Sequence, residues 1–446
     1  MKRSNDYRAA FARMRWGAFA VLLCLGLGTA ASAQQKGLGP FDRDNARAML
    51  RDMKDDIKSN YYDPNFRGMN LDEHFKEADE KLKQATTRDQ LMLVIAQAVL
   101  DFNDSHLFFA PPSRAADFEY GWQMQMFGDA CYITAVKPKT DAGAQGLKPG
   151  DTVLSVDGFR PTRDNLWKMY YRYYALMPAR SIRLVVQSPG EAKPRQLDVA
   201  SKIKKRTAAI QYDEFFFRLL REDYFDEKVK YVEAGKDVFV WKMKSFEADE
   251  KHVDVMMGKA KSFKTLILDL RGNGGGAQDT LKRLVSYFFD HDVTVATNKK
   301  RKESKPIIAK TRGGDMFKGN LIVLVDSNSA SAAEMFARII QLEKRGTVMG
   351  DKTMGAVMAA NWFDHQTGNG DVFFYGASVT VADVLMSDGK SLENVGVTPD
   401  EVMLPTGADL ASQRDPVLAH ACALAGAPVD AEKAGTFFPY EWRRTP

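Results

Sequence analysis

Cysteine is scarce in this sequence, which has three cysteines among 446 residues. Cys131 and Cys422 lie far apart in the chain, and Cys24 falls in an apolar stretch near its start. No spacing resembles the cysteine and histidine pattern of a zinc site, so we expect no metal. Two buried thiols are favoured over a disulfide. A bridge stays open as an alternative, because sequence spacing alone cannot pair two cysteines.

Long apolar runs are also lacking. Gly17–Ala30 is shorter than the roughly 20 residues of a membrane span, and no later stretch approaches that length. Five basic residues precede or flank it and small residues follow at 31–33, which is typical of a secretory signal peptide over residues 1–33. An uncleaved anchor is the alternative. Since Cys24 lacks the small neighbour of a lipidated cysteine, we expect a periplasmic or secreted protein, soluble after cleavage.

A strong charge of one sign is missing from the predicted mature chain. The whole sequence has a formal net charge of +5, and residues 1–33 carry five basic and one acidic side chain, so their removal leaves +1. A nearly neutral chain has little general attraction to nucleic acid or to an anionic membrane surface. The sequence therefore predicts no nucleic-acid partner.

The composition that remains is that of a globular protein. With 45% apolar and 27% charged residues, a chain of this length can bury a large core and predicts two or three domains. Apolar residues recur at helical spacing in 46–57 and 91–100, which predicts a helical N-terminal domain over 40–115.

A second segment, 117–203, has the order expected of a small β domain. Strands are predicted at 130–136, 151–156, 182–187 and 195–200, with a turn at Asp157-Gly158. Together with Gly-Leu-Lys-Pro-Gly-Asp before the second strand, this order resembles a PDZ domain. Such domains bind a peptide by adding it to a sheet edge. The alternative is a β module that only spaces other domains.

From residue 204 to 425 strands alternate with helices, which predicts an α/β domain with a largely buried sheet, followed by a tail over 426–446. Two loops there carry the chemistry, and they lie where apolar strands end. The expected strands are 237–243, 265–270 and 321–325, and the expected helices are 252–262, 280–289 and 332–343.

The first loop is Asp269–Gly276, with the sequence DLRGNGGG. Its glycines allow backbone amides to point at one spot, which suits an oxyanion. It lacks the ending of a P-loop and the spacing of a dinucleotide fingerprint, so no cofactor is expected. The second loop is Ser329–Glu334, with the sequence SASAAE, and it presents Ser331 before a helix. Ser331 is either a nucleophile beside the helix dipole or only an N-cap.

Four segments, LILDLRGNGGG, VLVDSNSASAAEMFARII, GDKTMGA and ENVGVTPD, resemble the C-terminal processing (tail-specific) serine peptidase family, which includes the tricorn core protease. The resemblance implies a multidomain α/β protein with a helical N-terminal domain, a PDZ-like domain and a peptidase domain of the crotonase/ClpP-like ββα-spiral type. It also implies that Ser331 is the nucleophile and that the amides of Gly274, Gly275 and Ala332 are the oxyanion donors.

One departure from the family changes the predicted base. Members of the serine–lysine type carry a lysine where this chain has Ala356. Lys352 lies nearby, but as a base it would need its pKa lowered far from about 10.4, so we expect a solvated lysine.

The tricorn-core type instead carries an adjacent serine and histidine, with a glutamate ahead of Gly-Val-x-Pro-Asp. This chain has Ser105, His106 and Glu393 at those places. By this resemblance His106 takes the proton of Ser331, Ser105 positions the imidazole, and Glu393 acts through Ser105 or binds the substrate's amino end. The alternatives are a structural histidine at 106 and a surface carboxylate at 393.

The predicted function is that of an exported serine peptidase acting on peptide or protein substrates, with the PDZ-like domain recruiting peptides or gating access. A homo-oligomer is compatible with this prediction. The alternative is a catalytically inactive relative that binds a peptide or a small ligand. A dead enzyme has no need to keep Ser331, the glycine loop and the Ser105-His106 pair together, which favours the enzyme.

Overall fold

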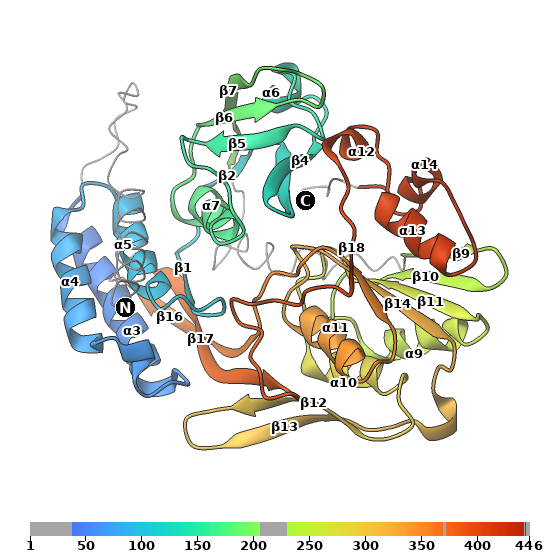
Figure 1. Cartoon of the computed structure of the whole chain (residues 1–446). Helices are drawn as coiled ribbons and strands as arrows, with labels where there is room; N and C mark the ends of the chain where they lie inside the picture. The colour runs from blue at the N-terminus through green and yellow to red at the C-terminus, as the bar shows by residue number, and fades with distance from the viewer. Residues whose placement is uncertain (1–37, 206–229, 369–371, 441, 443–446) are drawn as a thin grey trace, which may run out of the picture. The chain divides into compact units, whose positions relative to one another are not determined.

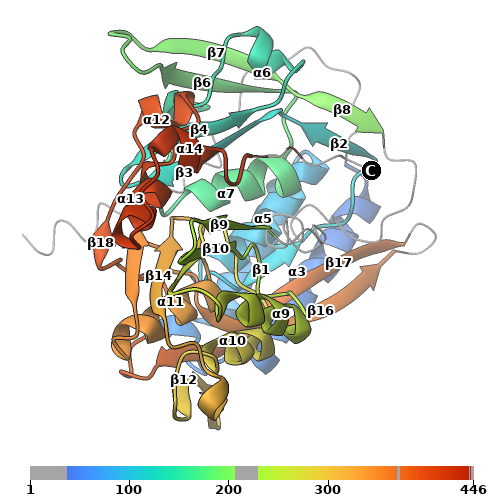
Figure 2. The same ribbon diagram turned by 90° about the vertical axis from the view of Figure 1, so that its right-hand side faces the viewer.

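The computed structural model describes residues 38–205, 230–368, 372–440 and 442. The predicted signal peptide and Cys24 lie outside these residues, as does most of the last part of the tail. From Pro40 onward the chain forms one unit, drawn in two views in Figures 1 and 2. Among the described helices, none is both long and apolar enough to cross a membrane.

Three helices form the N-terminal part of this unit, as Figure 1 shows in blue. α3 buries one stripe at Ala46, Met49, Met53 and Ile57, which follows the helical spacing. The helices predicted around 46–57 and 91–100 are confirmed, whereas α4 was not located from the sequence. The elements are α3 (Pro40–Asn60), η1 (Phe66–Gly68), α4 (Leu71–Gln84, with Asn70 as N-cap) and α5 (Arg88–Leu100, with Thr87 as N-cap).

An antiparallel five-stranded sheet follows, in the order β3-β4-β5-β6-β7. All four strands predicted in this segment are present, and β3, with its alternating burial, is an addition to the prediction. The strands are β3 (Trp122–Phe127), β4 (Ala130–Val136), β5 (Thr152–Val156), β6 (Ser181–Gln187) and β7 (Arg195–Ala200). With them go α6 (Asp141–Ala144), α7 (Leu166–Tyr171), η2 (Arg172–Leu176) and the ribbon of β2 (Ala116–Glu119) and β8 (Lys202–Lys205).

A six-stranded sheet in the order β18-β15-β14-β11-β10-β9 forms the centre of the larger α/β part. All neighbours are parallel except β9 and β10. Its strands are β9 (Lys230–Ala234), β10 (Val238–Lys242), β11 (Thr265–Asp269), β14 (Asn320–Val325), β15 (Thr347–Gly350) and β18 (Glu401–Val402). The three strands predicted here, near 237, 265 and 321, are confirmed.

Helices cover both faces of this sheet, which explains its near-continuous apolar strands. Leu266 and Leu268 pack with one layer of helices, whereas Ile267 between them packs against α13 on the other face. Figures 1 and 2 show the two layers. The first layer is α9 (Glu250–Ala260), α10 (Gln278–Val285) and α11 (Ala332–Leu342), and the second contains α13 (Pro416–Leu424) and α14 (Ala431–Gly435). The short helix α12 (Gly407–Ala411) lies instead against the β3–β7 sheet, where Gly407 approaches Gly150.

A further five-stranded sheet, called the β17 sheet below, joins the N-terminal part to the α/β part. Its long central strand β17 pairs with β1 at Phe108–Ala110, so the end of the predicted helical domain is a strand of this sheet. This sheet was not located from the sequence. It consists of β1 (Phe108–Ala110), β12 (Val293–Lys299), β13 (Ser304–Ala309), β16 (Met358–Thr367) and β17 (Phe373–Met386), with η3 (Gly313–Asp315) nearby in the chain.

The architecture is therefore mixed α/β, as predicted. Cys131 and Cys422 are both free and buried, which confirms the prediction of two thiols. The PDZ character of the β3–β7 sheet and the division of the chain at 115, 203 and 425 stay predictions.

Candidate active site

The glycine loop and the serine loop meet at one edge of the parallel sheet. β11 and β14 are neighbours with Asp269 opposite Leu324, so the loops that follow them begin side by side. A Cβ added at Gly275 would lie 2.6 Å from Ser331 Cβ, and Ala330 N donates to Asn273 O at 2.9 Å. Only glycine fits at 275, where φ is also +98°. The sequence prediction that the two loops meet is confirmed.

Ser331 occupies the N-cap position of α11 with φ 54° and ψ −118°, a conformation that a residue with a side chain rarely adopts. Two hydrogen bonds hold it there: Ser331 N donates to Ala356 O at 2.9 Å and to Glu334 Oε2 at 3.1 Å. Backbone strain of this kind persists only where the surroundings impose it, and it concentrates at functional sites. A simple helix cap does not require it.

The amides near Ser331 differ in what they bind. Gly275 N donates to Asn273 Oδ1 at 2.8 Å, so an anion would compete with this acceptor, and the role of Gly275 as an oxyanion donor stays a prediction. The side chain of Asn273 folds back onto the loop, which the sequence did not indicate. Within the described parts of the chain, the amides of Gly274 and Ala332 donate to no acceptor. These two remain available for an anion beside Ser331.

Ser105, His106 and Glu393 form a chain of hydrogen bonds. Ser105 Oγ lies 2.8 Å from His106 Nδ1 and 2.8 Å from Glu393 Oε2. When Glu393 is ionised it can only accept, so the Ser105 hydroxyl then donates to Glu393 and accepts from His106 Nδ1–H. This arrangement leaves His106 Nε2 without a proton and able to accept one. Glu393 is 9% exposed, so the alternative of a surface carboxylate is wrong.

The backbone of residues 356 and 357 joins this chain to the serine loop. Ala356 O accepts from Ser331 N, and the next amide, Val357 N, donates to Glu393 Oε2 at 3.0 Å. Glu393 Oε1 also accepts from Ser105 N at 2.8 Å. Ala356 thus takes part through its peptide and brings no basic side chain.

Asp104 fixes the segment that carries His106. This carboxylate is 3% exposed and accepts from His106 N at 3.0 Å, from Thr380 Oγ1 at 2.7 Å and from Tyr61 Oη at 2.9 Å. Tyr61 follows α3 and Thr380 lies in β17, so the N-terminal part and the β17 sheet hold the histidine jointly. Burial lowers the pKa of His106, while the nearby Asp104 acts in the opposite direction.

Glu334 is a residue of the site that the sequence reasoning did not single out. It is fully buried, and its carboxylate accepts from Ser331 N, Gly355 N at 2.8 Å, Ala356 N at 2.9 Å and the Thr353 hydroxyl. The Ser-x-x-Glu spacing of a capping box was the available signal. Burial raises the pKa of Glu334 to about 7, although its hydrogen bonds lower it. Burial, and then Asp104, raise the pKa of Glu393 to about 7 as well.

Lys352 is exposed, in agreement with a solvated lysine. Its backbone makes the recorded contacts: Lys352 N donates to Asp351 Oδ1 and Lys352 O accepts from Arg163.

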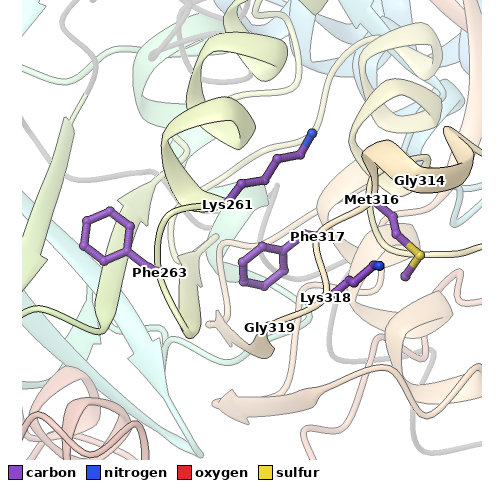
Figure 3. Close-up of a pocket in the computed structure, with 7 residues that line it drawn as sticks. All are labelled: Lys261, Phe263, Gly314, Met316, Phe317, Lys318 and Gly319. Carbon is purple, nitrogen blue, oxygen red and sulfur yellow. The ribbon is translucent and has the colours of Figure 1, made fainter.

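A surface pocket of about 330 Å³ lies elsewhere. As Figure 3 shows, its lining comes from residues 261–263, just before β11, and 314–319, just before β14. The glycine and serine loops follow the same two strands, so the pocket is at the opposite strand ends. Ligands of open α/β sheets bind at the carboxyl ends. Across the described residues, no cluster of side chains has the composition of a metal site.

A strained serine at a helix N-terminus beside a glycine-lined loop is an arrangement compatible with a serine hydrolase. Residues 238–403 match the model of Peptidase family S41. The Staphylococcus aureus (strain bovine RF122 / ET3-1) protein described as "Probable CtpA-like serine protease" is 24% identical over 351 residues, covering 75% of this chain and 62% of the relative. The chain thus spans less than two thirds of the length of that relative.

Solved structures with the same fold include mature CPAF complexed with lactacystin, with a TM-score of 0.63 and 14% identity over 83% of this chain and 95% of that one. The photosystem II D1 C-terminal processing protease has a TM-score of 0.50 and 18% identity over 81% and 93%. At these identities the likeness shows the fold alone. The family model that residues 238–403 match and the relative from Staphylococcus aureus are both those of serine peptidases.

Proposed function

We propose that this protein is an exported serine peptidase that hydrolyses peptide bonds of peptide or protein substrates. The observation that carries the proposal is the hydrogen-bond chain from His106 through Ser105 to Glu393, joined by residues 356 and 357 to a strained Ser331. This chain leaves His106 Nε2 able to accept a proton, and the peptides of residues 356 and 357 link it to Ser331, whose backbone has a φ of 54°.

In the proposed reaction Ser331 Oγ attacks the substrate carbonyl carbon and its proton passes to His106 Nε2. The amides of Gly274 and Ala332 stabilise the oxyanion that forms. His106 then gives the proton to the leaving amine, and water hydrolyses the ester on Ser331 by the same route. Ser105 positions the imidazole, and Glu393 acts through Ser105, because its two oxygens already accept from Ser105 and Val357.

The proposal places the site closer to the tricorn-core type than to the serine–lysine type. Support comes from Ala356, whose peptide oxygen holds Ser331 N while its methyl side chain offers no base. Lys352 lies in the same loop, but its side chain is exposed to solvent.

We assign peptide recruitment or gating to the PDZ-like β3–β7 sheet. The hairpin of β3 and β4 contacts the loops on both sides of Ser331. Gln125 Nε2 donates to Asp326 Oδ2 at 2.7 Å, and Gly128 N donates to Asp351 Oδ2 at 3.0 Å. Asp326 Oδ1 in turn accepts from Gly272 N of the glycine loop at 2.9 Å. A peptide that binds this sheet could therefore affect the glycine loop through the contacts of Gln125 with Asp326 and of Asp326 with Gly272.

The test is covalent labelling with a fluorophosphonate, comparing the wild type with Ser331→Ala and His106→Ala. We expect labelling of the wild type, none of Ser331→Ala, and a rate lower by orders of magnitude for His106→Ala. Thermal unfolding of each variant checks that it is folded.

The outcomes separate the alternatives. Absence of serine-dependent labelling, including in the presence of added peptides, would overturn the peptidase and favour a binding protein. Labelling that is unaffected by His106→Ala would overturn the histidine as base and leave the nucleophile in place.

A further inference from the structure

The helices after residue 403 lie outside the segment that matches the peptidase family model. α13 and α14 pack on the sheet face opposite α9–α11, where Val417, Leu418 and Ala421 contact the buried side chains of β10, β11 and β14. These strands include the one that leads into the glycine loop. The C-terminal helices are therefore in a position to affect that loop.

A bidentate ion pair makes the connection. Arg271, the residue before Gly272, donates from Nη1 to Asp415 Oδ1 at 2.9 Å and from Nη2 to Asp415 Oδ2 at 2.7 Å. The same guanidinium donates to both oxygens of the fully buried Asp269, at 2.9 and 2.8 Å. The side chains of Arg271 and Asp415 are 18% and 21% exposed, so water screens this pair only in part.

The charges at the base of the loop balance only with Asp415. Lys242 Nζ lies 3.2 Å from Asp269 Oδ1 and also donates to Arg271 O at 2.6 Å. Two cations, Lys242 and Arg271, thus face two carboxylates, Asp269 and Asp415. Without the charge of Asp415, the cluster has an uncompensated positive charge, and two N–H groups of Arg271 lose their acceptors.

Arg271 is tied to the backbone that presents the amide of Gly274. Arg271 N donates to Asp269 Oδ1 at 3.0 Å, and Asn273 N donates to Leu270 O at 3.1 Å. A shift of the guanidinium toward a new partner would move the peptides of 271–274. Amide donors in a proposed oxyanion site act only when they are held in place before the reaction.

We propose that Asp415 is a positioning residue of the active site, which holds the glycine loop through Arg271. The inference rests on the proposed function. It assigns to a helix outside the matched segment a role in the rate of the chemical step. Asp415 touches no reacting atom, and all of its effect passes through Arg271.

Asp415 also has a purely structural role, and the test has to separate this role from the proposed positioning of the glycine loop. Its Oδ1 also accepts from Leu418 N at 2.9 Å, as the N-cap of α13. Asparagine and serine are good N-caps, so Asp415→Asn and Asp415→Ser keep this cap while losing the charge and the bidentate pair. Asp430 is a matched control, because it caps α14 through Lys433 N in the same layer and has no recorded contact with the glycine loop.

The experiment measures the concentration dependence of fluorophosphonate labelling for the wild type, Asp415→Asn, Asp415→Ser and Asp430→Ala. For both Asp415 variants we expect the maximal labelling rate to fall about tenfold, with the half-saturating concentration changed by less than about twofold. Asp430→Ala removes a cap and is expected to label at the wild-type rate. Amide hydrogen exchange should be faster in residues 272–275 of the Asp415 variants and unchanged in Asp430→Ala.

The failures are distinguishable. A wild type without Ser331-dependent labelling overturns the proposed function and this inference with it. A labelled wild type with unchanged rates in both Asp415 variants overturns the inference alone. If the Asp415 variants are too unstable to label, unchanged exchange of residues 272–275 relative to Asp430→Ala, measured at low temperature, overturns it as well.

Discussion

Buried carboxylates occur in two parts of the proposed site, and their partners differ between the two. On the side of the glycine loop, Asp269 is paired with Arg271 and Lys242, and these cations hold its pKa below the usual range in spite of burial. On the other side, Glu334 and Glu393 accept only from amides and hydroxyls, and burial raises the pKa of each to about 7. No lysine or arginine pairs with either glutamate in the described chain.

The two parts differ in the pKa of their carboxylates: that of Asp269 is lowered, whereas those of Glu334 and Glu393 are raised to about 7. Because its pKa is lowered, Asp269 keeps its charge at a lower pH than an ordinary aspartate does, so its pairs can hold the glycine loop over a wide pH range. The amide-held side gains or loses protons near neutral pH. Near neutral pH we therefore expect the parts of the proposed site that position His106 and Ser331 to respond to pH more than the ion pairs of the glycine loop.

The largest expected effect is on the cation-paired side. Arg271→Met leaves Asp269 buried with only Lys242, and breaking such a pair costs about 3–5 kcal/mol of the free energy of unfolding. Urea unfolding measures it. The double variant with Asp269→Asn should recover part of the loss, because it removes the unpaired charge. A loss below about 1 kcal/mol would mean that the frame does not depend on this pair.

A smaller loss of stability is expected on the amide-held side from Glu334→Gln. A carboxamide has one acceptor oxygen, so two of the four donors around position 334 would face an NH₂ group. The free energy of unfolding should fall by about 1–3 kcal/mol, and labelling of Ser331 should slow by about a hundredfold. Glu343→Gln is the matched control on the same helix, with its side chain one third exposed. Equal labelling of both variants would exclude a role for the Glu334 carboxylate.

The next largest effect is expected in the way the free energy of unfolding depends on pH. Since the folded-state pKa of each glutamate lies above its ordinary 4.5, the folded protein binds these protons more tightly than the unfolded chain. The free energy of unfolding should therefore decrease as pH rises from about 4.5 to about 7. Asp269 acts in the opposite direction, because its lowered pKa contributes stability that is lost on acidification below its ordinary value.

Labelling should follow the opposite trend to stability, because a protonated Glu393 can donate to Ser105 Oγ instead of accepting from it. The rate is expected to rise as pH passes through about 7, while unfolding in urea becomes easier over the preceding range. Glu393→Gln should flatten the change of stability with pH. A labelling rate that is flat from about pH 6 to 8 would show that Glu393 does not govern the state of His106.

The smallest effect is expected from Lys352→Ala, which removes an exposed ammonium beside the amide-held side. Labelling should stay within about twofold of the wild type and stability within about 0.5 kcal/mol. A loss of tenfold or more would instead assign the base to lysine, despite Ala356.

The sequence predicted the parts of this site that follow continuous apolar strands. β11 and β14 are buried on both faces, so their runs stand out, and the loops after them follow. Ser105, His106 and Glu393 came from the family resemblance, because no local pattern links residues 288 apart. β17 was not located, since Tyr375 to Thr380 are buried consecutively and include Gly376 and Ser378, without an alternation of apolar and polar residues. Glu334 was overlooked because a Ser-x-x-Glu capping box is ordinarily exposed to solvent.

The three-residue strand β1 has a consequence for the order in which the protein is built. It pairs with β17 two residues after His106, and Ser105 reaches Glu393 from the far end of the chain. A growing chain that has passed Ser331 but has not reached residue 393 already contains the nucleophile and its helix, yet the contacts that hold the histidine do not exist. In the proposed mechanism the site is therefore complete only when residues 105 and 106 have met residue 393.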